Sequence, residues 1–181
     1  MNKQPEVTEQ TRKNLIAACF DLIKEQGKAT VNEITKAAGY NRCTFYRYFT
    51  DTRQLLDSVE DEICENLGNA IRQAASNSTE ETMDAFATVY TTYGSYISVL
   101  LGEHGDSVFR TKMRKIAEPA VIKHFNISAE NEAEAALKTE YVISAALGTI
   151  VRWYDLDMPI STRKLAELIV VSASHGVIAN L

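Results

Sequence analysis

The chain has 181 residues, a net charge of −5 and 45% hydrophobic residues, a composition that excludes an intrinsically disordered protein. Its apolar runs are too short and too often interrupted for a membrane-spanning helix, and the polar N-terminus lacks a signal-peptide pattern. We therefore expect a cytoplasmic protein. Cys19, Cys43 and Cys64 are widely spaced, so we expect reduced thiols and neither a metal site nor a cofactor.

The charge is unevenly distributed along the chain. Residues 1–56 carry nine Lys or Arg against six Asp or Glu, a net charge of +3, and the remaining residues carry −8. An acidic body with a basic head can approach DNA with one end only.

Nearly every segment has the apolar period of a helix, so the sequence predicts an all-α fold. The first helix places Leu15, Cys19, Leu22 and Ile23 on one face. Gly27 follows where a helix C-cap is expected.

Two short helices are predicted next. Thr30 and Glu33 form a capping box that opens a second helix, which Gly39 ends. Asn41 can cap a third helix that we expect to reach about Phe49.

The helical pattern continues to the end of the chain. Asp106, Ser128 and Ser161 each precede a helical segment, as N-caps do. The sequence therefore predicts a three-helix, helix-turn-helix domain at 1–56, joined to a domain of about five or six helices at 57–181.

A helix, a Gly-containing turn and a second short helix form a helix-turn-helix, whose second helix enters the major groove of DNA. The early residues of that helix meet base edges, and here they are Asn41, Arg42, Cys43 and Thr44. Arg42 can donate a bidentate pair to guanine. The residues one turn further on suit phosphates, and they are Tyr46, Arg47 and Tyr48.

The run AAGYNRCTFYRYFTDTRQLL resembles the TetR-family signature, with an Ala-Gly turn, a Thr-Phe-Tyr-x-x-Phe recognition helix and a closing Leu. The resemblance covers residues 8–57. It implies that Arg42, Cys43 and Thr44 face bases, that Tyr46 and Tyr48 face phosphates, and that Thr30, Val31 and Asn32 lie at the DNA backbone. The family usually has a phosphate-contacting Lys at the position of Thr52, so we expect Thr52 or its neighbour Arg53 to make this contact.

The family also has an all-helical body that binds an inducer and dimerises through its last two helices. Aromatic side chains suit the walls of a ligand pocket, and the candidates are Phe86, Tyr90, Tyr93, Tyr96, Phe109, Tyr141 and Trp153. Small and apolar residues on the last two helices suit a dimer interface, and the candidates are Ser144, Ala145, Gly148, Leu165, Leu168, Ile169, Ser172 and Gly176.

We therefore expect a homodimeric transcriptional regulator, in the role of a repressor, that binds double-stranded operator DNA and is released by a small-molecule inducer, with no membrane partner. A small all-α enzyme is an alternative, but no catalytic motif is present and we expect no enzyme. A second alternative is a TetR-like protein-interaction subunit that does not read DNA.

Overall fold

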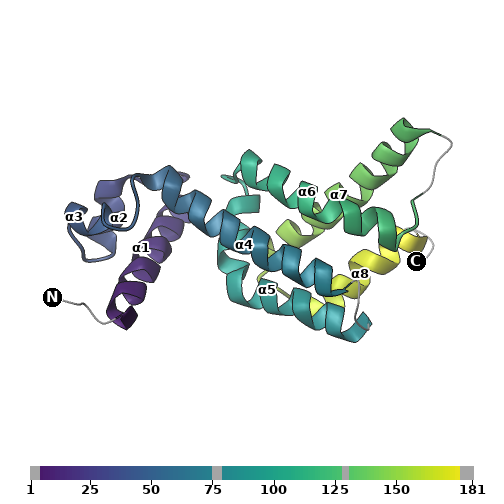
Figure 1. The fold of residues 1–181 in the computed structure, drawn as a ribbon, viewed down its shortest axis with the longest axis horizontal. Coiled ribbons are helices and arrows are strands. Elements are labelled where there is room, and N and C mark those ends of the chain that lie inside the picture. The colour runs from purple at the N-terminus through teal and green to yellow at the C-terminus, as the bar shows by residue number, and fades with distance from the viewer. Residues whose placement is uncertain (1–4, 75–78, 128–130, 176–181) are drawn as a thin grey trace. The chain divides into compact units, whose positions relative to one another are not determined.

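The structure is a computed structural model that describes residues 5–74, 79–127 and 131–175 (Figure 1). These residues form eight α-helices and no strand, which confirms the predicted all-α class. The chain divides into two compact units, the first ending at Glu62 and the second beginning at Ile63. The division falls inside the helix α4 (Thr52–Ala74).

The first unit contains α1 (Pro5–Gln26), α2 (Val31–Ala37), α3 (Arg42–Phe45) and the start of α4. Helix α2 packs against both α1 and α3. The buried apolar side chains of this unit come from all four helices and the segment before α4, and include Leu15, Ile16, Cys19, Phe20, Ile23, Ile34, Phe45, Phe49, Leu55 and Val59. Burial raises the pKa of the Cys19 thiol to about 12, so this cysteine stays protonated and serves as a packing residue.

The predicted ends of the first two helices are confirmed. Gly27 follows α1 with φ of 75°, and its N–H donates to the carbonyl of Ile23 at 2.8 Å. Gly39 follows α2 with φ of 74°. Both are left-handed conformations that glycine adopts without steric cost, so each helix stops where the sequence indicated.

Helix α3 is shorter than predicted. It ends at Phe45, whereas the sequence suggested that it reaches about Phe49. Beyond Phe45 the hydrogen bonds tighten, because the N–H of Arg47 donates to Thr44 and that of Tyr48 to Phe45, each three residues back. Such bonds close turns and short 3₁₀ segments, so Tyr46 to Tyr48 lie in a turn that follows the helix.

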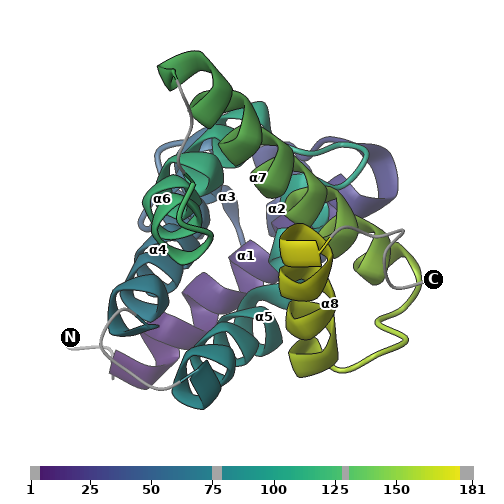
Figure 2. The ribbon, with the colours of Figure 1, turned by 90° about the vertical axis from the view of Figure 1, so that its right-hand side faces the viewer.

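The second unit is a helical bundle (Figure 2). Besides the end of α4 it contains α5 (Thr79–Leu101), α6 (Ser107–His124), α7 (Glu132–Asp155) and α8 (Thr162–His175). Helix α5 packs against α6, α7 and α8, and α7 also packs against α6 and α8. The largest buried side chains of the unit include Ile63, Ile97, Leu101, Phe109, Ile143 and Trp153.

Three caps define the starts of the later helices. The Asp106 carboxylate accepts from the N–H of Val108 at 2.7 Å, and the Ser161 hydroxyl accepts from that of Lys164 at 3.3 Å, so both predicted caps are confirmed. Helix α7 is capped by Asn131, whose side chain accepts from the N–H of Glu134 at 2.8 Å. The predicted cap Ser128 lies outside the described residues.

Helices α5 and α7 approach closely at a glycine. A Cβ atom on Gly94 would lie 3.0 Å from the Oη atom of Tyr154, so this position has little room for a side chain. Burial raises the pKa of Tyr154 and raises that of the neighbouring Tyr90 to about 12. Both phenols are therefore neutral at physiological pH.

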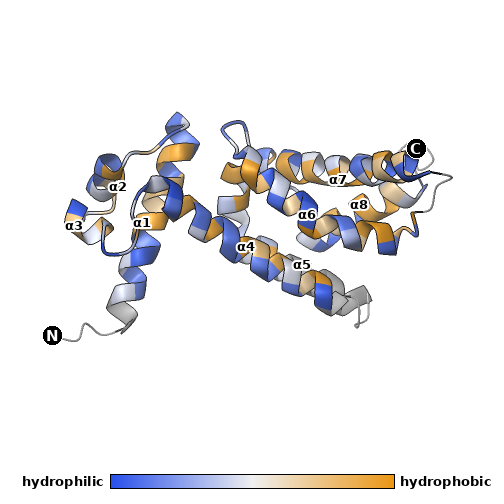
Figure 3. Cartoon of the chain, turned by 45° about the horizontal axis from the view of Figure 1, so that its top comes forward, coloured by the Kyte–Doolittle hydropathy of each residue, from blue (hydrophilic) through white to orange (hydrophobic). Residues whose placement is uncertain are grey.

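Hydrophobic and hydrophilic positions alternate around most of the helices (Figure 3). In the ranges that the structure describes, no helix is long and apolar enough to span a membrane.

Candidate nucleic-acid interface

Helix α3 is fixed at its start by Asn41. The Asn41 Oδ1 atom accepts from the backbone N–H of Thr44 at 2.8 Å and from the Thr44 hydroxyl at 3.1 Å. This arrangement is the predicted N-cap. Because the Thr44 hydroxyl donates its proton to Asn41, this side chain supports the cap as well as standing near the proposed DNA surface.

Two aromatic rings anchor the segment in the core. Phe45 has no exposed surface and Phe49 is 4% exposed, and their ring centroids lie 5.6 Å apart. With these rings pointing inward, Asn41, Arg42, Cys43, Tyr46 and Arg47 are exposed, and Thr44 and Tyr48 are half-buried. This segment therefore carries seven of the twelve residues that the sequence predicted to contact DNA, and none of the seven is fully buried.

Arg42 and Tyr46 form a pair on the exposed side of α3. Nη2 of Arg42 donates to Oη of Tyr46 at 3.1 Å, and the guanidinium carbon lies 5.8 Å from the centre of the Tyr46 ring. Their spacing of four residues is the usual one for side chains that meet along a helix. From the sequence, Arg42 was expected at a base and Tyr46 at a phosphate, and no contact between the two side chains was predicted.

The turn between α2 and α3 is bonded to α1. Nδ2 of Asn14 donates to Oη of Tyr40 at 3.0 Å, and the backbone N–H of Tyr40 donates to Thr35 at 2.8 Å. No short sequence pattern indicates this contact, because its partners are 26 residues apart.

Helix α2 begins with the predicted capping box. The Thr30 N–H donates to Oε2 of Glu33 at 2.9 Å, and the Glu33 N–H donates to the Thr30 hydroxyl at 3.3 Å. Hydrogen bonds from Thr30 lower the pKa of Glu33. Thr30 and Asn32 are exposed here, and Val31 is half-buried.

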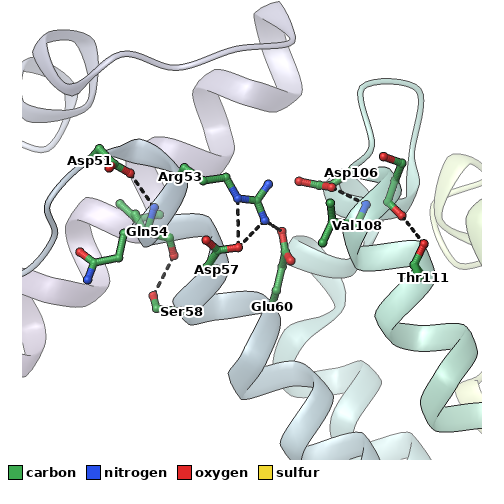
Figure 4. Close-up of polar contacts among 11 residues, drawn as sticks. Asp51, Arg53, Gln54, Asp57, Ser58, Glu60, Asp106, Val108 and Thr111 are labelled. Carbon is green, nitrogen blue, oxygen red and sulfur yellow. Dashed lines mark hydrogen bonds and ion pairs between the residues drawn. The ribbon is translucent and has the colours of Figure 1, made fainter.

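Arg53 at the start of α4 is held by two carboxylates (Figure 4). Its Nε atom donates to Oδ1 of Asp57 at 3.0 Å, and its Nη2 atom donates to Oε1 of Glu60 at 2.7 Å. The Glu60 side chain is fully buried, whereas that of Arg53 is 44% exposed. The guanidinium therefore neutralises a buried charge, and Thr52, half-buried at the first position of α4, stands beside it.

Two family models match the chain, one to each unit. A model described as bacterial regulatory proteins of the tetR family matches residues 15–59. A model described as a transcriptional regulator C-terminal region matches residues 93–175. The chain belongs to the TetR family of transcriptional regulators. The resemblance seen in the sequence is thereby confirmed.

Solved structures of TetR-family regulators share the fold. The fatty acid degradation regulator FadR from Bacillus halodurans is 16% identical, with a TM-score of 0.67 and 98% of each chain covered. A TetR transcriptional regulator from Streptococcus agalactiae is 20% identical, with a TM-score of 0.63, covering 93% of this chain and 96% of that one. The complex of SmeT with triclosan is 11% identical, with a TM-score of 0.60, covering 91% of this chain and 90% of that one.

The TetR assignment makes the chain a DNA-binding regulator of transcription, and the tetR-family model spans the helix-turn-helix of α2 and α3. No group of three or more His, Cys, Asp or Glu side chains within the described ranges is placed to hold a metal ion.

The aromatic residues proposed for an effector pocket lie in different surroundings. Phe109 and Trp153 are buried, and the indole N–H of Trp153 donates to the carbonyl of Ile160 at 2.8 Å. Tyr90, Tyr93 and Tyr96 are half-buried, Tyr141 is 68% exposed, and the side chain of Phe86 lies outside the described residues.

A groove of about 690 Å³ opens instead between the end of α5 and the helices α6 and α7. Its charged residues include Arg110, Arg114 and Glu140, and Nε of Arg114 lies 2.6 Å from Oε2 of Glu140. Its apolar wall includes Leu101 and Leu147. Of the seven predicted aromatic residues, the six whose side chains the structure describes do not line this groove.

The residues proposed for a dimer interface are divided between surface and core. Ser144, Ala145, Gly148 and Leu168 are exposed, Ile169 and Ser172 are half-buried, and Leu165 is buried within the protomer. Ser144 and Gly148 also line the groove. Gly176 lies outside the described residues.

The carboxylates around Arg53 lead to a prediction about the phosphate contact at α4. Arg53→Ala should lower the free energy of unfolding by about 1–3 kcal/mol, because buried Glu60 loses a charged donor. It should leave the salt dependence of DNA binding nearly unchanged, because the guanidinium is already engaged. Urea unfolding and salt-titrated DNA binding measure the two effects.

Arg47→Ala is the matched control, since Arg47 is an exposed cation in the turn after α3. It should reduce the salt slope by about 1, as the loss of one phosphate contact does. An equal reduction for Arg53→Ala would show that Arg53 does contact a phosphate.

Proposed function

We propose that the chain is a dimeric repressor that reads a roughly palindromic operator with two recognition helices and releases it when a small molecule binds its helical body. One observation supports the operator-reading role. The Asn41 cap and the buried Phe45 ring hold α3 in place, while Arg42 and Cys43 face solvent at its start. In a helix-turn-helix these are the positions that meet base edges.

Arg42 is the residue that we assign to a base. Its guanidinium is exposed, and an arginine that makes one hydrogen bond to Tyr46 keeps further N–H groups for the O6 and N7 atoms of a guanine. Cys43 offers a small side chain beside it. Thr44, whose hydroxyl is bonded to Asn41, contributes its methyl group.

We assign DNA binding to the domain predicted at 1–56 and effector binding and dimerisation to the domain predicted at 57–181. A two-fold dimer places two reading heads on one duplex, and the separation of the heads selects the half-site spacing. One family model matches the first unit and another matches the second, which supports assigning separate functions to the two domains.

The dimer interface that we propose is the outward side of α7 and α8. Leu137 is 71% exposed and Tyr141, one turn later, is 68% exposed. On α8, Leu168 and Val171 are 49% and 43% exposed. Large apolar side chains left in solvent on two adjacent helices are typical of a face that a partner covers. A second copy of this chain, packed through the same face, covers them in a two-fold dimer.

The effector site that we propose is the groove between α5, α6 and α7. Its apolar residues can cover the hydrophobic part of a ligand. A polar or anionic group on the ligand can replace the Glu140 carboxylate as the partner of Arg114. The SmeT complex contains triclosan, so this fold admits a small aromatic molecule. Binding releases the operator if the ligand prefers a conformer whose heads no longer match the half-sites.

The operator-reading role is tested with Arg42→Ala. Duplexes selected by the full chain from random-sequence DNA should bind the wild type tightly, with resistance to unrelated competitor DNA. Arg42→Ala should lose about 1–3 kcal/mol of binding free energy and should tolerate substitution at one base pair in each half-site. Enrichment of no sequence at all would contradict a sequence-specific reader and favour a scaffold that does not read DNA.

The dimer face is tested with Tyr141→Asp, which places a charge where an apolar contact is expected. The dissociation constant of the dimer should rise by about 30-fold or more, the effect of losing a central interface residue, as measured by sedimentation equilibrium. Val108→Asp, at a 50% exposed position on α6, should leave the dimer intact. A wild-type chain that is monomeric at all concentrations would refute the dimer.

The effector groove is tested with Thr111→Phe, because Thr111 lines the groove from α6 and a larger side chain fills it. Library compounds that raise the wild-type Tm and weaken operator binding should lose both effects on this variant. Lys115→Phe, at an exposed position one turn further along α6, should respond as the wild type does. Equal responses of the two variants would place the effector elsewhere.

A further inference from the structure

The guanidinium of Arg42 is restrained by its neighbour Tyr46. It donates one hydrogen bond to the hydroxyl of Tyr46 at 3.1 Å and lies 5.8 Å from the centre of that ring. A long exposed side chain otherwise samples many rotamers, and each must be given up when the side chain binds. An arginine already restrained by a neighbour gives up less freedom on binding.

The Tyr46 ring is itself restrained by a contact with Phe45. The two rings meet edge to face, with centroids 5.7 Å apart and an interplanar angle of 88°. Phe45 is fully buried, and the Tyr46 backbone N–H donates to the carbonyl of Arg42 at 3.1 Å. The position of the guanidinium is thus set by the core through one intermediate ring.

The Tyr46 hydroxyl has a second capacity. A phenol oxygen accepts hydrogen bonds and also carries one proton to donate. Here its oxygen accepts from Arg42, and the residue is 50% exposed. The hydroxyl proton can therefore be donated to a phosphate oxygen while the bond from Arg42 persists, and donation polarises the oxygen so that it accepts more strongly.

We propose that Tyr46 is a positioning residue for base reading: it holds the Arg42 guanidinium for a guanine edge and couples that contact to the phosphate backbone through its own hydroxyl. This inference rests on the proposed role of Arg42 in reading a base. It differs from a simple phosphate contact, because a phosphate contact strengthens binding to every sequence alike, whereas a positioning residue changes discrimination.

The test compares Tyr46→Phe, Arg42→Ala and the double variant in the full chain. The DNA probes are the duplex selected from random sequence, the same duplex changed at the base pair that depends on Arg42, and a scrambled duplex. Tyr46→Phe should weaken binding to the selected duplex by about 5- to 10-fold, the cost of one hydrogen bond. It should weaken binding to the other two duplexes by a smaller factor, and the factor should also be smaller in the Arg42→Ala background, where only the phosphate contact of Tyr46 remains to be lost.

Tyr48→Phe is the matched control, since Tyr48 is a tyrosine in the same turn whose ring packs beside Phe49. It should affect all three duplexes by the same factor. If Tyr46→Phe also acts equally on all duplexes and in both backgrounds, Tyr46 is a phosphate contact only and the inference is overturned. If Arg42→Ala relaxes no base pair, the proposed role of Arg42 fails, and the inference fails with it.

A measurement without DNA tests the restraint directly. The Nε–H signal of Arg42 in NMR spectra of the free protein should show restricted motion in the wild type and in Tyr48→Phe, and greater motion in Tyr46→Phe. An unchanged order parameter in Tyr46→Phe would overturn the positioning role whatever the DNA measurements show.

Discussion

Helix α3 has only four residues, too few to be stable alone, so its position depends on the burial of the Phe45 ring. Asn41 closes one end of the helix, and Phe49 returns the chain to the core just beyond the other. These anchors fix the backbone between them, and the backbone sets the direction in which each side chain leaves the segment. The buried residues therefore decide which side chains of this segment face solvent, and the proposed DNA-binding surface results from the packing of a very small core.

A buried residue also determines the side-chain contacts at the start of α4. Glu60 is buried on this helix, and a buried carboxylate requires a charged or hydrogen-bonding partner. Arg53 meets this need two turns earlier on the helix and also bonds Asp57. Arg53, which the sequence predicted as a possible DNA contact, is thus paired with carboxylates of the protein itself. The positive head has fewer available charges than a count of lysines and arginines indicates.

Local chemistry was predictable from the sequence. The caps at Thr30, Asn41, Asp106 and Ser161 depend on a side chain and a backbone N–H two or three residues away, so short patterns suffice. The helix-turn-helix followed from the caps at Thr30 and Asn41 and from Gly39 between the two helices. The end of α3 was not predicted, because the three-residue hydrogen bonds that follow Phe45 have no short pattern in the sequence.

Features that depend on tertiary packing could not be predicted. Helical periodicity shows that α7 has apolar positions, but it does not show which of them face the protomer, so exposed Tyr141 and buried Trp153 looked equivalent. The groove lined by Arg114 and Glu140 joins residues 26 positions apart. The bond between Asn14 and Tyr40 is equally remote in sequence.

The division of α3 into inward and outward residues has an evolutionary consequence. Phe45 and Asn41 determine whether the segment folds, and Arg42 and Cys43 are exposed beside them without contributing to the core. Substitutions on the surface of a protein usually change stability little. Under the proposed function, one copy that arises by gene duplication can therefore acquire a new operator by exchanging two adjacent exposed side chains, while the fold tolerates each intermediate along the way.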